Sequence, residues 1–217
     1  LPSRLDRAQQ IARKLRGVLG DVPVGIASLT DRTLPDLMPT TDPALFEHTL
    51  TQSVGIDEPP PSQPYKQGRA FSFSALVPVV TSHFFSPAAK HRLLVVFTDG
   101  EAQPGTQLFG ISVAHELQPI FVNVWSQDER IFTHGKPDPY YRADVRSTAS
   151  LEQAAHVTNG YVFDEHQVSQ LKAQARKILG SGEDTARISA YARTSLAPWF
   201  ALGGVLPLAF LLWRRNA

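Results

Sequence analysis

The chain has 217 residues, of which 42% are hydrophobic and 19% are charged, and its formal net charge is +1. This is the composition of an ordinary globular protein, and it lacks the basic stripe interleaved with aromatic residues that indicates nucleic-acid binding. The absence of cysteine excludes disulfides, thiolate zinc sites and cysteine nucleophiles, and the seven histidines show no metal-binding spacing such as HExxH.

The N-terminal part predicts a helix followed by two strands. Residues 4–20 carry an apolar stripe with arginine and glutamine opposite, and Gly20 closes this amphipathic helix. Residues 22–30 are typical of a strand. Residues 32–40 predict a weaker strand, which Pro35 places at the edge of a sheet. The apolar stripe of the helix consists of Leu5, Ala8, Ile11, Ala12, Leu15, Val18 and Leu19.

Asp42 and Pro43 predict the start of a second helix, because aspartate is a good N-cap and proline suits the first helical position. A loop rich in proline follows over 55–68. A third helix is expected over 70–85, with a kink at Pro78. The buried side of the second helix is expected to consist of Leu45, Phe46, Thr49 and Leu50.

Strands and helices alternate in the second half of the chain. Asn159 and Gly160 are expected to end one helix, and Asp164 with Gln167 has the spacing of a capping box. The expected elements are a buried strand over 91–98, a helix over 106–118, a strand over 119–126, a polar excursion over 127–145, a helix over 147–160, a strand over 160–165 and a helix over 164–182. This alternation predicts an α/β, Rossmann-like fold with a mostly parallel central sheet and helices on both faces.

The C-terminal residues predict a membrane anchor. Residues 196–213 carry no charge and have about the minimum length of a transmembrane helix, with Trp199 and Trp213 near the two ends. Arg214 and Arg215 follow at once, which favours a cytoplasmic C-terminus and a domain outside the cytoplasm. The alternative is a buried C-terminal core helix. The expected organisation is a domain over 1–182, a linker over 183–195, a transmembrane helix over 196–213 and a basic tail over 214–217.

Asp99 is the candidate functional residue. It directly follows the predicted strand 91–98, and in an open α/β sheet ligands bind outside the carboxyl ends of the strands. Gly100 allows a sharp turn there, and a carboxylate at this place suits a hard cation such as Mg²⁺. The alternative is that Asp99 is only a turn residue. Glu101 is expected to be solvated.

The sequence resembles a von Willebrand factor type A domain over roughly residues 4 to 180. The resemblance is carried by the order of helices and strands, by "VVFTDGE" at residues 95–101, and by the helix "PTTDPALFEHTL" at residues 39–50, which follows an edge strand. It is most similar to the bacterial, membrane-anchored type found among aerotolerance (Bat) proteins. A trailing membrane helix with a basic end is in keeping with that group.

This resemblance implies a metal-ion-dependent adhesion site for Mg²⁺, or for Mn²⁺ or Ca²⁺. In the family, a D-x-S-x-S motif, a threonine and an aspartate share the ion. The aspartate corresponds to Asp99, and Ser72 is the expected substitute for the threonine. The D-x-S-x-S motif and its strand would precede residue 4 and are missing, so we expect the chain to be N-terminally truncated and the site to be partial or degenerate.

Three functions follow from these patterns. The first is a protein–protein interaction module anchored in the bacterial inner membrane, whose partner, such as another subunit of a membrane complex, binds with a divalent cation. The second is a scaffold subunit that works without metal. The third is a Mg²⁺-dependent hydrolase, disfavoured because the required D-x-D-x-T motif is replaced by "TDGEA" at residues 98–102. We expect no enzymatic activity and no nucleic-acid partner.

Overall fold

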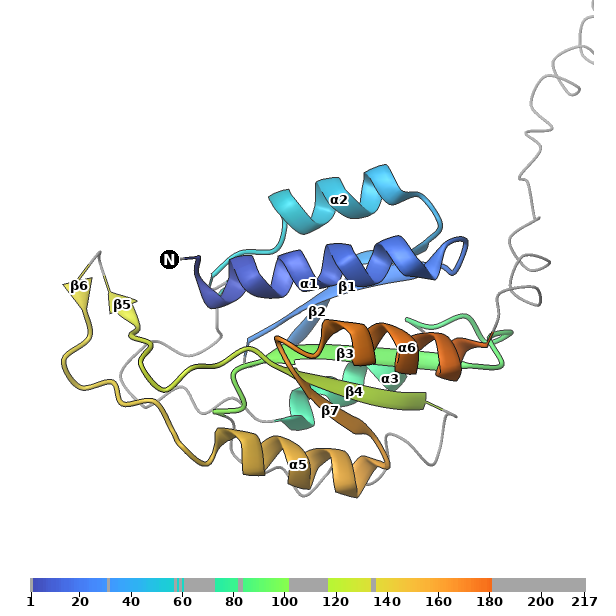
Figure 1. Cartoon of the computed structure of the whole chain (residues 1–217). Coiled ribbons are helices and arrows are strands. Elements are labelled where there is room, and N and C mark those ends of the chain that lie inside the picture. Colours follow the sequence, from blue (N-terminus) through green and yellow to red (C-terminus); the bar gives the residue numbers. More distant parts are fainter. Residues whose placement is uncertain are drawn as a thin grey trace, which may run out of the picture. The chain divides into compact units, whose positions relative to one another are not determined.

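The computed structural model describes residues 2–30, 32–56, 58, 60, 73–81, 84–101, 117–133 and 136–180 (Figure 1). They belong to a compact unit that spans Leu1–Gly182. The linker, the expected transmembrane helix over 196–213 and the basic tail lie outside the described residues. Within the described ranges, no helix has the length and apolar character needed to cross a membrane.

In the described part of the chain, three strands form a parallel sheet at the centre of the domain, as the alternating pattern predicts. Its order is β3 (Arg92–Thr98), β4 (Leu117–Asn123) and β7 (Tyr161–Asp164), with β4 in the middle. Both neighbours pair with β4 in parallel. Because the three strands run in the same direction, the residues that follow them meet at one edge of the sheet, the carboxyl edge.

The first two strands form a separate antiparallel pair, β1 (Val24–Leu29) and β2 (Thr33–Thr40). Pro35 lies in β2 opposite Ala27, and β2 pairs with β1 alone in the part of the chain that the structure describes. This agrees with the edge position that Pro35 predicts. No pairing between described residues joins β1 to β3. The strand with D-x-S-x-S that the resemblance places before residue 4 stays a prediction.

Helices cover both faces of the parallel sheet (Figure 1). On one face, α1 (Arg4–Leu19) and α6 (Val168–Leu179) pack through Ile11, Leu15 and Leu171 onto Ile120 and Val122 of β4. On the other face, α5 (Ser147–Thr158), the 3-10 turn η1 (Phe73–Leu76) and α3 (Val77–Thr81) pack against Leu117 and Phe121. Successive side chains of β4 alternate between these two clusters, as strand geometry requires.

The helix α2 (Pro43–Gln52) begins as predicted at Asp42, whose carboxylate accepts hydrogen bonds from the backbone N–H groups of Ala44 and Leu45. Phe46, Thr49 and Leu50 are buried. The prediction for Leu45 is wrong, because its side chain is 44% exposed. Leu45 precedes Phe46 by one residue, about 100° around the helix, and so lies on the solvent side of the buried stripe.

Two further helix predictions need correction. The region expected to form one kinked helix over 70–85 contains η1 and the short α3 instead, and Pro78 is the second residue of α3, where a missing N–H is tolerated. Leu117 and Gln118 were expected to end a helix but belong to β4, because Leu117 is buried and pairs with Arg92. Residues 106–116 of that helix lie outside the described residues.

The end of α5 agrees with the sequence, whereas the last helix, expected over 164–182, begins later than predicted. Asn159 ends α5 in the left-handed conformation, with φ 51°. The Asp164 carboxylate accepts a hydrogen bond from the Gln167 N–H, and the Gln167 side chain accepts one from the Asp164 N–H. The two bonds have the pattern of the predicted capping box, but they close a turn before the helix, because α6 begins only at Val168 with Gln167 as its N-cap. The polar excursion also contains a short antiparallel pair, β5 (Phe132–Thr133) and β6 (Lys136–Pro137).

Candidate functional site at the carboxyl edge

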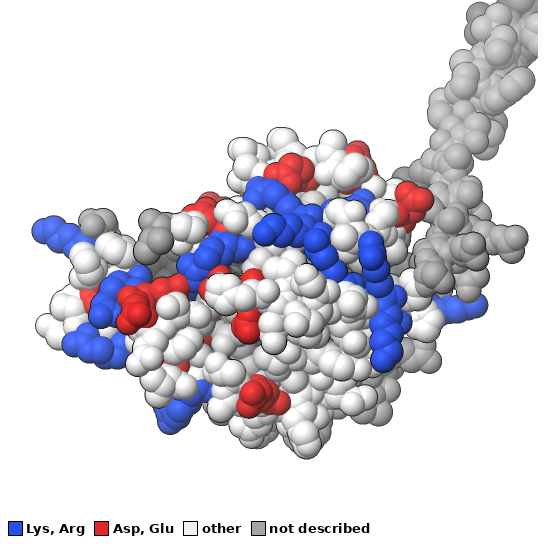
Figure 2. Space-filling model, in the orientation of Figure 1, with Lys and Arg blue, Asp and Glu red and all other residues white. Residues whose placement is uncertain are grey.

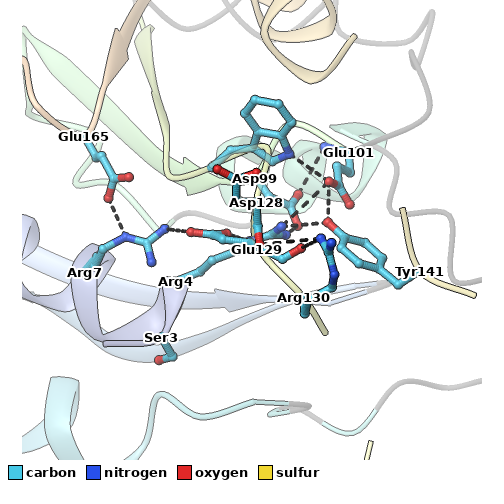
Figure 3. Close-up of polar contacts among 12 residues, drawn as sticks. Ser3, Arg4, Arg7, Asp99, Glu101, Asp128, Glu129, Arg130, Tyr141 and Glu165 are labelled. Atoms are coloured by element: carbon cyan, nitrogen blue, oxygen red, sulfur yellow. Dashed lines mark hydrogen bonds and ion pairs between the residues drawn. The ribbon is translucent and has the colours of Figure 1, made fainter. Parts of the chain in front are cut away.

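Charged side chains meet at the carboxyl edge of the sheet (Figure 3). Asp99 and Glu101 follow β3, Glu129 follows β4, and Glu165 follows β7. Two arginines reach them from the first turn of α1. We call this group the carboxyl-edge cluster; it consists of Arg4, Arg7, Asp99, Glu101, Glu129, Tyr141 and Glu165.

The start of α1 places the two arginines. Ser3 and Asp6 form a complete capping box, so the helix begins firmly at Arg4. Arg4 and Arg7 are three residues apart and therefore lie on the same face of the helix. That face points towards the residues that follow the strands.

Arg4 lies at the centre of the cluster. Its Nη1 donates to Asp99 Oδ2 at 2.8 Å, its Nη2 donates to Tyr141 Oη at 2.7 Å, and its Nε donates to Glu129. Its guanidinium also lies 5.7 Å from the centre of the Tyr141 ring. The side chain is 22% exposed. One guanidinium thus holds together residues that follow two different strands.

Arg7 extends the cluster to the third strand. Its Nε donates to Glu165 at 2.6 Å, and its Nη2 donates to Glu129. Glu129 is therefore bound by both arginines. Burial tends to raise the pKa of Glu129, but the hydrogen bonds from Arg4 and Arg7 outweigh burial and lower it. This carboxylate stays charged at neutral pH.

Glu101 is not solvated as the sequence suggested, since its side chain is only 16% exposed. Its Oε1 accepts hydrogen bonds from the Trp125 indole at 2.9 Å, from the Tyr141 hydroxyl at 2.6 Å and from the Asp144 backbone N–H at 3.2 Å. A carboxylate with three donors on one oxygen is a structural anchor. Glu101 fastens the segment after β4 to the end of β3.

Asp99 is at the carboxyl edge, where the sequence places it. Its Oδ1 accepts the Glu101 N–H at 3.1 Å, which forms a tight turn, and its Oδ2 accepts from Arg4. Gly100 within this turn has a φ of +71°. Burial raises the pKa of Asp99 more than the Glu101 N–H and Arg4 lower it. With 36% of its side chain exposed, Asp99 is the most accessible of the four carboxylates.

The described residues do not fit a divalent ion at Asp99 while Arg4 is in place. Arg4 already supplies a cation to Oδ2, and the described ranges contain no group of three or more His, Asp or Glu side chains arranged to hold a metal. Ser72, the expected second ligand, lies outside the described residues. The assignment of Asp99 and Ser72 as ligands stays a prediction.

Sequence reasoning identified Asp99 but missed the rest of the cluster. The signal was present, because Glu129 and Glu165 also follow strands of the same parallel sheet. Arg4 and Arg7 were assigned to the solvent side of an amphipathic helix, and nothing in the local pattern shows that this side meets the sheet edge. Tyr141 belongs to a loop whose path depends on contacts distant in sequence.

The Tyr141 phenol is expected to lose its proton at a higher pH than an ordinary tyrosine. Burial, and after it donation to Glu101, raise its pKa from 10.0 to about 12 against the opposing effect of Arg4. Since the folded protein holds this proton more tightly, the contribution to stability is complete below pH 10 and is lost as the pH rises to about 12. Phenolate absorbance during alkaline titration measures this, and Tyr141→Phe should remove a step near pH 12. A titration unchanged by Tyr141→Phe would contradict the prediction.

Comparison with known proteins identifies the fold. No protein-family model matches the sequence, and no curated protein matches it. Among solved structures, the chain is similar to BatB, a conserved hypothetical protein from Bacteroides thetaiotaomicron, with a TM-score of 0.67 at 17% identity over 83% of this chain and 90% of that one. It is also similar to an aerotolerance-related membrane protein from Bacteroides fragilis, with a TM-score of 0.63 at 19% identity over 82% and 89% of the two chains. The chain shares the fold of these two proteins.

Proposed function

We propose that this protein is a membrane-associated protein–protein interaction module of the von Willebrand A type that recognises its partner with the carboxyl edge of its sheet. The observation that carries the proposal is the carboxyl-edge cluster, in which two guanidinium groups hold four carboxylates and Asp99 is the most accessible. The fold shared with BatB and the aerotolerance-related membrane protein supports it.

The charges of the cluster suit recognition. Four carboxylates face two guanidiniums, so the edge keeps an excess of negative charge. Fixed hydrogen bonds hold these groups in place before a partner arrives, which reduces the entropy cost of binding. A basic side chain of the partner would add its positive charge to those of Arg4 and Arg7 and would pair with Asp99.

Binding without metal is the form that the contacts favour, because Arg4 supplies the cation to Asp99. The second candidate is the cation-dependent site, in which Asp99 and Ser72 hold Mg²⁺, Mn²⁺ or Ca²⁺. The observations that support this second candidate are the excess negative charge of the cluster and the exposure of Asp99. A Mg²⁺-dependent hydrolase is a weaker proposal, since the sequence lacks D-x-D-x-T.

Membrane association is part of the proposal. Its support is the uncharged stretch 196–213 with the arginines that follow it, together with the description of one neighbour as a membrane protein. The orientation proposed is a bacterial inner-membrane protein with the folded domain outside the cytoplasm. In spheroplasts, added protease should digest the domain, and a protected domain would overturn the orientation.

Photo-crosslinking in native membranes tests the function. A crosslinking residue replaces exposed Asp128, which lies beside the cluster, or exposed Glu152 on α5 as the control. The expected result is a discrete crosslinked protein from position 128 alone, lost with Asp99→Ala and unchanged by EDTA. Loss with EDTA would select the cation-dependent form. Equal crosslinking with Asp99→Ala would overturn recognition by the carboxyl edge.

A further inference from the structure

Exposed apolar side chains are concentrated in the segment between β4 and α5. Nine large hydrophobic side chains are exposed in the described part of the chain, and four of them fall within residues 131–145. They are Ile131, Phe132, Tyr140 and Val145, exposed by 44%, 63%, 90% and 69%. A soluble domain rarely gathers apolar surface in this way without a binding role.

Three cations belong to the same segment as these apolar side chains. Arg130, Lys136 and Arg142 are exposed, and none of them forms an ion pair with a described carboxylate. Arg130 donates to the Glu129 carbonyl at 2.9 Å, and Arg142 donates to the Pro139 and Tyr141 carbonyls at 2.8 and 2.7 Å. Their positive charge is therefore available to a partner. In Figure 2, basic side chains project from the end of the molecule where Figure 1 places β5 and β6.

Hydrogen bonds hold this segment in position. Tyr141 is fixed by Glu101 and Arg4, while the adjacent Tyr140 is almost fully exposed. The Asp138 carboxylate accepts the Tyr140 N–H at 2.8 Å, and the Asp138 N–H donates to the Ile131 carbonyl at 2.8 Å. The contacts that build the carboxyl-edge cluster thus also present Tyr140 to solvent.

We propose that this surface, the hairpin surface formed by Arg130, Ile131, Phe132, Lys136, Tyr140 and Arg142, docks an acidic segment of the protein partner that carries aromatic or aliphatic side chains. The inference rests on the proposed function and names the chemistry of its partner. Apolar side chains of the partner pack against Phe132 and Tyr140, and carboxylates of the partner pair with Arg130, Lys136 and Arg142. Aromatic side chains and arginine are the residues that dominate binding energy at protein interfaces.

A protein suits this surface better than a lipid bilayer does. The start of α1 lies at the carboxyl edge, near the hairpin surface, and the end of α1 contacts the end of α6, where Arg176 donates to the Val18 carbonyl at 3.4 Å. The last described helix, α6, therefore ends on the side of the domain opposite the hairpin surface (Figure 1). The test below includes phosphatidylglycerol vesicles, to which the hairpin surface would bind if its target were a bilayer.

The test uses a fluorescent synthetic peptide of glutamate and aspartate interspersed with leucine and phenylalanine. Its controls are the same peptide with lysine for the acids and one with serine for the apolar residues. Fluorescence anisotropy of the acidic apolar peptide should show binding that Phe132→Ser with Tyr140→Ser weakens by about tenfold or more. Ile56→Ser and Met38→Ser, at exposed apolar positions elsewhere, should leave binding unchanged.

The charge component has its own variants. Replacing Arg130, Lys136 and Arg142 together by glutamine should abolish both the preference for the acidic peptide and its sensitivity to salt. Equal binding of all three peptides, or binding that survives Phe132→Ser with Tyr140→Ser, would overturn the proposal. Binding to phosphatidylglycerol vesicles that exceeds peptide binding and is lost with the same variants would also overturn it.

The crosslinking assay separates this inference from the proposed function. If Asp99→Ala and Phe132→Ser with Tyr140→Ser each abolish crosslinking from position 128, both stand. If Asp99→Ala abolishes it and the hairpin variants do not, the proposed function stands and the hairpin surface fails. If the hairpin variants alone abolish it, recognition by the carboxyl edge fails and the hairpin surface stands.

Discussion

Replacing Arg4 with alanine is expected to lower the free energy of unfolding by about 2–3 kcal/mol, a value between those of exposed and fully buried ion pairs. The substitution removes donors to Asp99, Glu129 and Tyr141. It also leaves carboxylates close together in a partly buried place without their shared cation. Urea denaturation at neutral pH measures the change.

Arg13→Ala is the matched control. Arg13 is also an arginine of α1, and its Nε donates to Glu47 at 2.8 Å. The two side chains of that pair are 35% and 50% exposed, so its loss should cost less than about 0.5 kcal/mol. Equal effects of Arg4→Ala and Arg13→Ala would show that the carboxyl-edge cluster adds nothing beyond a surface ion pair.

The same variant tests whether Arg4 takes the place of a metal ion. Without the guanidinium, Asp99 and Glu129 lose the cation that they share, and Asp99 Oδ2 is open to a divalent ion. Mg²⁺ should then raise the unfolding temperature of Arg4→Ala and leave that of the unchanged chain constant, because a ligand stabilises only the state that binds it. Equal stabilisation of both proteins would support the cation-dependent form of the site.

The sequence predicts the fold well where local signals and burial agree. Residues 91–98 predict β3 because an uninterrupted apolar run suits a strand covered on both faces. Asp42 and Asn159 mark helix ends through backbone chemistry that needs no distant partner. Leu117 is different, because its pairing with Arg92 decides that it belongs to a strand, and that partner is remote in sequence.

The candidate site shows the same limit. The position of Asp99 follows from one rule on strand ends, which needs only the local pattern. The burial of Glu101 depends on Trp125 and Tyr141, which are distant in sequence and approach it only in the folded chain. Arg4 looks like a solvent-facing helix residue until α1 is placed on the sheet. The residues whose positions the sequence does not predict are therefore mostly those with partners distant in sequence.

Gly100→Ala is expected to lower the free energy of unfolding by about 3 kcal/mol, through two additive causes. Gly100 has a φ of +71°, where a side chain costs about 1 kcal/mol. An added Cβ would also lie 2.7 Å from the Ser147 carbonyl oxygen and 3.0 Å from Leu151 Cγ. Backbone at that distance has to move, and forcing extra atoms into a packed place costs about 1–3 kcal/mol.

Gly180→Ala separates the two causes. Its φ is +75°, close to that of Gly100, but an added Cβ would meet nothing within 4 Å. With a ψ of 171° this conformation is essentially restricted to glycine, so the change should cost about 1–3 kcal/mol from backbone conformation alone. Because Gly100 lies between Asp99 and Glu101, its replacement should also disturb the turn that places Glu101 against Tyr141. The Tyr141 titration should then move from about 12 towards 10.0 in Gly100→Ala and stay in place in Gly180→Ala. Equal stability losses in the two variants, with Tyr141 unchanged, would mean that contact with Ser147 does not hold the site in shape.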